Sequence, residues 1–352
     1  MRKGRSMKKN RLRNGILSFI VLCLCGCSQI VSEKEETDPY VPQERKVLQT
    51  LPVQKADGSV ISLQISDDPI PEEAYTEPEH KGTVEQFYYN TRTYGLYGVE
   101  DKAVKKYAEV YLPYGYEKGK QYKIAYLMHG AGGNAERFFG SPDEPRRLNA
   151  IVDNMIASGE MEPMIFVTLT YYPDNEEHEH MPDWDATYTK AFGQELRNDV
   201  IPQVEENYDL HATREDRLFG GFSMGSVTTY YRMCDCMDLF AYYLGMSGSL
   251  LWGADHPDKS EISRYLIDQI KAQGYTDKDF FLYSSSGTED FADKVVKAQV
   301  EAEKEHPEFF HFGEDGQPAN VVYQSVEGAD HDSANTDRVF YNFLPQLSKL
   351  MN

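Results

Sequence analysis

Cysteine is scarce in this sequence. Only five of the 352 residues are cysteines, and three of them lie within the first 27 residues. The other two, Cys234 and Cys236, stand two positions apart in an expected helix, where their side chains diverge. We interpret them as buried free thiols, so the sequence excludes a disulfide framework.

Basic residues are also few, with 36 Lys and Arg against 57 Asp and Glu and a formal net charge of -21. Loss of residues 1–26 would leave 29 basic residues and a charge near -28. A strongly acidic chain repels phosphate backbones, which argues against nucleic acid as a partner.

No apolar run near the start is long enough to span a membrane. The run 16–24 follows seven Lys and Arg residues, a pattern typical of a signal peptide, and is too short to cross about 30 Å of hydrocarbon. It ends in Leu-Cys-Gly-Cys at 24–27, which resembles a bacterial lipobox. We expect cleavage before Cys27 and lipid on that residue, so that the protein is extracytoplasmic and anchored to the bacterial envelope by lipid alone. An ordinary cleaved signal is the alternative.

Composition divides the rest of the chain into two parts. Residues 27–80 are rich in Glu, Lys, Pro, Asp and Ser, which predicts a solvated tether, with a possible short strand at 60–65. Residues 81–352 carry alternating apolar patterns and are expected to form one domain.

In this domain, strand-like and helix-like segments alternate. The expected strands are 84–89, 103–112, 123–128, 164–169, 217–222, 242–246, 280–284 and 321–325. The expected helices are 146–158, 188–207, 224–233, 262–273, 291–303 and 337–350. This order predicts an α/β fold with a mostly parallel central sheet and helices on both faces. Pro202 is expected to kink or split the second helix.

The strongest motif is Gly-Phe-Ser-Met-Gly at 221–225, between a strand and a helix. It is typical of a nucleophile elbow, in which a tight turn projects the serine and only small residues fit on either side. We therefore predict Ser223 as the nucleophile. The loop His-Gly-Ala-Gly-Gly at 129–133 follows the third strand, and we expect the N–H groups of Ala131 and Met224 to form an oxyanion hole.

A serine hydroxyl needs a base that is neutral near pH 7, for which histidine is suited. We predict His331 because it lies in the turn between the last expected strand and the last helix, where loops at one end of the sheet converge. His129 is the alternative, although its place before Gly130 favours a structural role.

The histidine needs a carboxylate to orient it. Thr-Glu-Asp at 288–290 follows the strand 280–284, and we predict Asp290, with Glu289 and then Asp293 as alternatives. The chain order Ser223, Asp290, His331 is that of α/β hydrolases.

Other polar and aromatic residues lie near the expected site. His178 and His180 stand in an acidic loop, which we interpret as solvated rather than metal-binding. Tyr171, Tyr172 and Trp184 flank this loop and offer flat rings for a sugar or a phenolic acid, although ordinary core or surface positions are equally consistent. We expect no metal and no cofactor.

Residues 83–350 resemble the esterase D-like group of α/β hydrolases, especially carbohydrate esterase family 1, which contains feruloyl and acetylxylan esterases. The matching segments are Val-Tyr-Leu-Pro at 110–113, Tyr-Leu-Met-His-Gly at 126–130, Gly-Gly-Phe-Ser-Met-Gly at 220–225, Gly-Thr-Glu-Asp at 287–290 and Gly-Ala-Asp-His-Asp at 328–332. The resemblance implies that Asp290 and His331 complete the triad.

It also implies cleavage of feruloyl or acetyl esters on a decorated polysaccharide such as xylan. The same group resembles siderophore esterases of the enterochelin type and formylglutathione hydrolases, so small-ester hydrolysis is the alternative function. A binding lipoprotein without catalysis is a third interpretation. The sequence shows no carbohydrate-binding module or xylanase domain.

Overall fold

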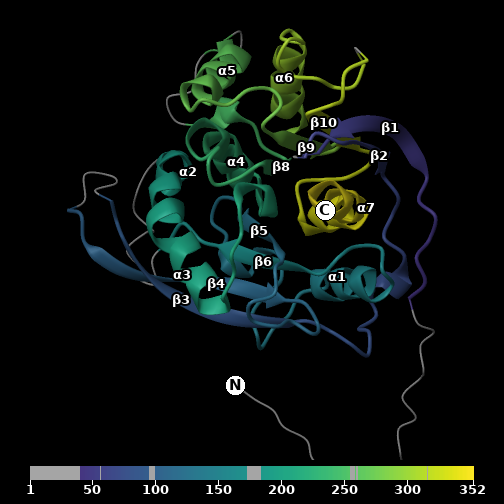
Figure 1. The fold of residues 1–352 in the computed structure, drawn as a ribbon, viewed down its shortest axis with the longest axis vertical. Coiled ribbons are helices and arrows are strands. Elements are labelled where there is room, and N and C mark those ends of the chain that lie inside the picture. Colours follow the sequence, from purple (N-terminus) through teal and green to yellow (C-terminus); the bar gives the residue numbers. More distant parts are fainter. Residues whose placement is uncertain are drawn as a thin grey trace, which may run out of the picture. The chain divides into compact units, whose positions relative to one another are not determined.

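The computed structural model describes residues 40–352 except 56, 95–99, 173–183, 254–257, 259–260 and 315. Its central element is an eight-stranded sheet in the order β10-β9-β8-β7-β5-β6-β4-β3 (Figure 1). The strands from β10 to β6 in this order run parallel, while β4 and β3 are antiparallel to their neighbours. The strands are β3 (Thr83–Arg92), β4 (Ala103–Leu112), β5 (Lys123–Met128), β6 (Met164–Leu169), β7 (Arg217–Phe222), β8 (Tyr242–Met246), β9 (Phe281–Gly287) and β10 (Val321–Val326). The predicted α/β class is confirmed.

Both faces of the sheet are buried, and the strand period explains how. In β5, Ile124 and Tyr126 point into one hydrophobic core, while Ala125 and Leu127 point into the other, since successive side chains of a strand alternate. Helices α2 to α5 line the first core, and α1 and α7 line the second (Figure 1). The helices are α1 (Leu148–Ala157), α2 (Trp184–Glu195), α3 (Ile201–Tyr208), α4 (Met224–Asp235), α5 (Ile262–Ala272), α6 (Asp293–Lys304) and α7 (Ser333–Met351).

The expected helix 188–207 is divided, as Pro202 predicted. A π-helical turn at Leu196–Val200 joins α2 to α3. Pro202 lies in the first turn of α3. Pro202 has no N–H to bond the carbonyl four residues earlier, and the helix leaves the regular α-helical pattern in the turn directly before it.

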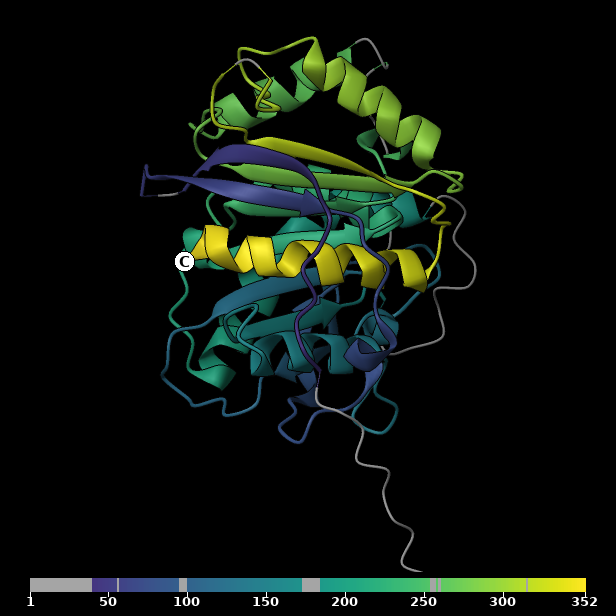
Figure 2. The ribbon, with the colours of Figure 1, turned by 90° about the vertical axis from the view of Figure 1, so that its right-hand side faces the viewer.

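Within the segment expected to be a tether, residues 47–66 form two strands, which differs from the prediction. Strands β1 (Val47–Gln54) and β2 (Val60–Ser66) form an antiparallel hairpin that lies along α7 (Figure 2). Leu51, Val53, Leu63 and Ile65 are buried between hairpin and domain. The possible strand at 60–65 corresponds to β2, whereas β1 was not expected. The apolar surface that the pair covers belongs to α7, 282 residues later at the contact of Gln64 with Gln346.

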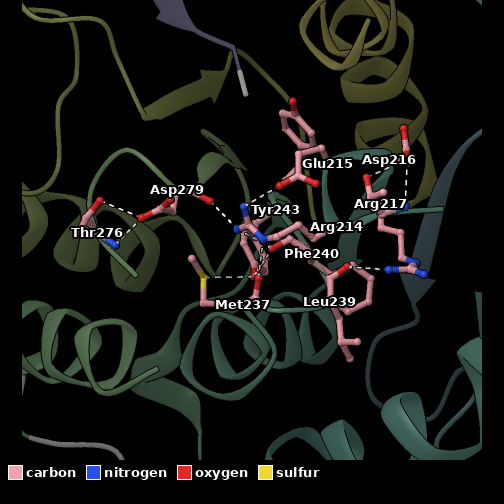
Figure 3. Close-up of polar contacts among 12 residues, drawn as sticks. Arg214, Glu215, Asp216, Arg217, Met237, Leu239, Phe240, Tyr243, Thr276 and Asp279 are labelled. Atoms are coloured by element: carbon pink, nitrogen blue, oxygen red, sulfur yellow. Dashed lines mark hydrogen bonds and ion pairs between the residues drawn. The ribbon is translucent and has the colours of Figure 1, made fainter. Parts of the chain in front are cut away.

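Arg214 forms hydrogen bonds near the amino ends of three central strands (Figure 3). The Arg214 guanidinium donates to the carbonyl oxygens of Met237 and Phe240, just before β8, and to that of Asp279, just before β9. The backbone carbonyl of Arg214, three residues before β7, also accepts the N–H of Ala241 at 2.9 Å. These contacts fix the relative positions of the strands β7, β8 and β9 at the edge opposite to the predicted site.

Candidate active site

Ser223 lies in the turn between β7 and α4, in a strained backbone conformation with φ 57° and ψ -116°. A Cβ atom added at Gly221 would lie 2.5 Å from the Gly225 carbonyl carbon, and one at Gly225 would lie 2.1 Å from the Met128 carbonyl oxygen. Glycine is therefore required at both positions of the motif. The turn holds Ser223 at the carboxyl edge of the sheet, as a nucleophile elbow requires.

Asp290 and His331 meet at this same edge. Asp290 follows β9, His331 follows β10, and both strands are parallel to β7, so their carboxyl ends lie together. The His331 Nδ1–H donates to Asp290 Oδ1 at 2.8 Å. The same oxygen accepts the Ala292 N–H at 2.7 Å. The structure thus joins the predicted histidine and carboxylate, whereas Glu289 is exposed and Asp293 bonds Ser286 and Lys297 instead.

The surroundings of Asp290 favour its charged form. Burial alone would raise the pKa of this carboxyl, but hydrogen bonding by His331, the Ser247 hydroxyl and the Ala292 N–H outweighs burial and holds the pKa below its usual range. An ionised Asp290 accepts a hydrogen bond from the Nδ1–H, so the neutral ring carries its proton on Nδ1 and Nε2 has none.

The imidazole lies beside the elbow. The His331 ring packs against the ring of Phe222, which precedes Ser223, with 4.5 Å between centroids. Among the described residues, neither the Ser223 hydroxyl nor His331 Nε2 has a hydrogen-bond partner, and the two do not bond each other. Catalytic hydrogen bonds often tighten only when substrate binds, so the unpaired hydroxyl and nitrogen are compatible with a nucleophile and its base.

The loop after β5 lies directly against the nucleophile. A Cβ atom at Gly130 would lie 3.0 Å from the Cβ of Ser223. The backbone N–H groups of Ala131 and Met224 have no hydrogen-bond partner among the described residues. Ala131 follows Gly130 and Met224 follows Ser223, so both donors are adjacent in sequence to the contact between the loop and the elbow, and their role as an oxyanion hole stays a prediction.

His129 is occupied elsewhere. Its Nδ1 is 2.6 Å from the Gly130 carbonyl oxygen, and its Nε2 is 3.1 Å from Thr170 Oγ1. Burial lowers the pKa of His129 to about 4, so the ring is neutral near pH 7. With both nitrogens engaged, His129 shapes the loop that carries Ala131.

Tyr171 and Tyr172 are brought to the site but are buried. Tyr171 is 1% exposed, and its hydroxyl bonds Thr228 Oγ1 at 2.6 Å. The Tyr172 hydroxyl accepts the Gly132 N–H at 3.3 Å, so it supports the loop that carries Ala131. Both rings therefore pack beneath the site in this structure and expose little surface for stacking.

Several predicted residues give no further geometry. Trp184 begins α2, but its side chain lies outside the described part of the chain, as do His178, His180 and Cys27. Within the described residues, no three His, Cys, Asp or Glu side chains gather as metal ligands. In the same residues no helix has the length and apolarity needed to cross a membrane.

Sequence reasoning missed two side chains that contact the site. The Phe291 ring lies 4.1 Å from the His331 ring between centroids, and Phe291 is 70% exposed. The Arg137 guanidinium lies 4.5 Å from the centre of the Phe222 ring and donates to Ser333 Oγ at 2.7 Å. Phe291 directly follows Asp290 in the sequence, and this adjacency was the available signal.

Comparison with known proteins identifies relatives. The protein is 34% identical over 250 residues to endo-1,4-beta-xylanase Y of Acetivibrio thermocellus, a match covering 68% of this chain and 22% of that protein. It is 31% identical over 146 residues to an endo-1,4-beta-xylanase/feruloyl esterase of Xylanibacter ruminicola, covering 40% of this chain and 19% of the relative. The matches thus span about a fifth of the length of each relative.

A solved structure of a mutant feruloyl esterase module from Clostridium thermocellum, complexed with sinapinate, matches with a TM-score of 0.66 and 29% identity. The match covers 87% of this chain and 96% of the module, and the predicted α/β-hydrolase fold is confirmed. The family model Esterase, described as "Putative esterase", matches residues 105–341. The chain belongs to this esterase family.

Proposed function

We propose that the protein is a serine carboxylesterase that removes feruloyl or acetyl groups from a plant polysaccharide such as xylan. The observation that carries the catalytic part is the hydrogen bond from His331 to Asp290 beside the Ser223 elbow. The names of the relatives, which include xylanases and feruloyl esterases, support the substrate class.

In the first step, Ser223 Oγ attacks the ester carbonyl carbon while its proton moves to His331 Nε2. Asp290 offsets the charge of the imidazolium that forms. When the tetrahedral intermediate collapses, the bond from carbon to the sugar oxygen breaks, and the Nε2 proton passes to that oxygen. The sugar leaves as an alcohol, and the acyl group remains on Ser223 as an ester.

In the second step, His331 takes a proton from water, and the resulting hydroxide attacks the acyl-enzyme. Collapse returns the proton to Ser223 Oγ and releases the carboxylic acid. In both steps the oxyanion would accept hydrogen bonds from the N–H groups of Ala131 and Met224. Each such donor typically contributes about 100- to 1000-fold in rate.

The decisive experiment combines labelling and hydrolysis. We expect a serine-directed phosphonate to modify the protein once per chain at Ser223, and S223A to fold but remain unlabelled. Wild type should hydrolyse methyl ferulate or acetylated xylan faster than a catecholate trilactone or a formyl thioester. A folded wild-type protein that takes no label would contradict the esterase mechanism. Preference for the trilactone or the thioester would contradict the substrate class while keeping the mechanism.

We further propose that residues 1–26 are removed as a signal peptide and that Cys27 carries lipid at the bacterial envelope. The support is the basic and apolar sequence that ends in Leu-Cys-Gly-Cys at 24–27. Wild type should fractionate with membranes and C27S should be soluble. Equal fractionation of the two proteins would contradict the anchor.

A further inference from the structure

Phe291 is an exposed aromatic ring at the proposed catalytic centre. It is 70% exposed, and its centroid lies 4.1 Å from that of His331. A phenylalanine side chain gains free energy when it leaves water, so a substrate that covers this ring beside His331 would gain affinity. Contact with a substrate would supply the missing burial.

The turn that carries Phe291 is held firmly. Asp290 Oδ1 accepts hydrogen bonds from the His331 Nδ1–H and the Ala292 N–H. The same carboxylate therefore orients the histidine and closes a turn over the residues on either side of Phe291. The Asp293 N–H also donates to the Asp290 carbonyl oxygen at 3.0 Å. The ring therefore has a fixed backbone relative to His331, which lowers the entropy lost on binding.

A second aromatic residue, Trp252, packs against Phe291. The two rings are stacked, with 5.9 Å between centroids and 28° between planes. Trp252 also packs against the cluster of Ala292, Val296 and Val300. It ends the short 3-10 helix Leu250–Trp252, whose start is held by Gln299 Oε1, which accepts from Ser249 Oγ and the Leu250 N–H. The contact with Trp252 restricts the Phe291 ring, while Phe291 stays 70% exposed.

The position beside His331 decides which part of the ester this surface meets. The proposed mechanism requires His331 Nε2 to give its proton to the departing sugar oxygen, so that oxygen lies within hydrogen-bond reach of the imidazole. The acyl carbon, by contrast, is held at Ser223 and the oxyanion donors. A ring in contact with the imidazole therefore flanks the alcohol half of the substrate.

We propose that Phe291, backed by Trp252, is the binding surface for the sugar that leaves, and that it selects carbohydrate esters over esters of small alcohols. The ring would pack against the C–H face of a pentose or hexose, as aromatic side chains do with flat amphipathic partners. The proposal rests on the proposed esterase function and names the subsite for its leaving group.

The test compares two esters of the same acid. Methyl ferulate has a leaving group too small to reach the ring, whereas a feruloylated arabinose-xylose oligosaccharide has a sugar in that place. For F291A we expect the ratio of the oligosaccharide KM to the methyl ferulate KM to rise about three- to tenfold. The oligosaccharide kcat should change much less. F291Y retains a flat ring and should restore the wild-type ratio.

Tyr114 provides the matched control. It is also an exposed aromatic residue, at 56% exposure, and it follows the end of β4. β4 runs antiparallel to β6, and Tyr111 near the end of β4 lies opposite Phe166 near the start of β6. The end of β4 therefore lies at the amino edge of the parallel strands, whereas Ser223 lies at their carboxyl edge. Y114A should leave the KM ratio unchanged.

An unchanged KM ratio in a folded F291A protein would overturn the inference. An equal rise of KM with both esters also leaves the ratio unchanged, and it would mean that Phe291 acts on the acyl group or on His331 alone. Both outcomes leave the esterase function intact. If wild type hydrolyses neither these two esters nor acetylated xylan, the proposed function itself fails, so the two failures are distinguishable.

Discussion

At the scale of single residues, Asp290 performs two tasks with one oxygen atom. Oδ1 accepts one hydrogen bond from the His331 Nδ1–H and another from the Ala292 N–H. The first contact concerns catalysis and the second concerns the turn before α6. An asparagine at this position would separate the two tasks, because its carbonyl oxygen still accepts from backbone N–H but cannot stabilise an imidazolium.

We predict that D290N folds normally and loses about 10³- to 10⁴-fold in kcat on methyl ferulate, because the histidine loses its tautomer control and its counter-charge. Circular dichroism and initial rates measure the two effects. The control is E289Q, which changes the neighbouring exposed carboxylate. Full activity in D290N, or an equal loss in E289Q, would show that the orienting acid is a different residue.

At the scale of an element, α6 carries a buried carboxyl group, Glu303, which contacts the Gln299 side chain that holds the start of the helix Leu250–Trp252. Gln299 Nε2 donates to Glu303 Oε1 at 2.9 Å, while Glu303 Oε2 is buried with no hydrogen-bond partner in the described residues. Burial raises the pKa of Glu303 to about 7. The folded state therefore holds this group protonated at pH values where the unfolded chain releases the proton.

This difference in pKa makes stability fall as the pH rises. Between the ordinary value near 4.5 and about 7, the unfolded state binds fewer protons than the folded state, so the free energy of unfolding decreases across that window. We predict that E303Q, measured against wild type by urea unfolding, gains on the order of 2 kcal/mol between pH 4.5 and pH 8.

Glu301 is exposed on the same helix, and E301Q is the control for which no such gain is expected. If the difference between E303Q and wild type is the same at both pH values, Glu303 titrates as an ordinary carboxyl and the assignment is wrong.

At the scale of the whole molecule, the hairpin of β1 and β2 extends the domain beyond the residues that match the esterase family. Polar contacts reinforce its apolar packing, since the Gln64 N–H donates to Gln346 Oε1 and Asn342 Nδ2 donates to the Asp68 carbonyl oxygen. The hairpin and α7 therefore stabilise each other, and α7 begins two residues after His331.

We predict that L63A destabilises the protein by about 2–4 kcal/mol, the usual cost of a cavity at a buried leucine. Leu63 is fully buried although it lies in the segment whose composition suggests a tether. Denaturant unfolding measures the loss. V60A on the same strand is the control, because Val60 is 55% exposed and should change stability by less than about 0.5 kcal/mol. Equal effects would mean that the hairpin does not pack in solution as it does here.

The sequence by itself determined the features that depend on neighbours in the chain. Each strand, each helix and the glycines around Ser223 are local patterns, recognised from a few adjacent residues, and the order Ser223, Asp290, His331 is read by comparing such segments along the chain. Parallel strands then bring their following loops to one edge, so the pairing of Asp290 with His331 followed from topology.

Tertiary structure alone decided which side chains are covered and which are open. Tyr171 is buried and Phe291 is exposed, although both follow strands and both are aromatic. Leu63 is buried because α7 lies over it. Burial depends on which distant segment packs on a residue, and the sequence near that residue carries no record of the segment. Local motifs therefore predicted the catalytic residues. Packing between distant parts of the chain decided which side chains a substrate can contact.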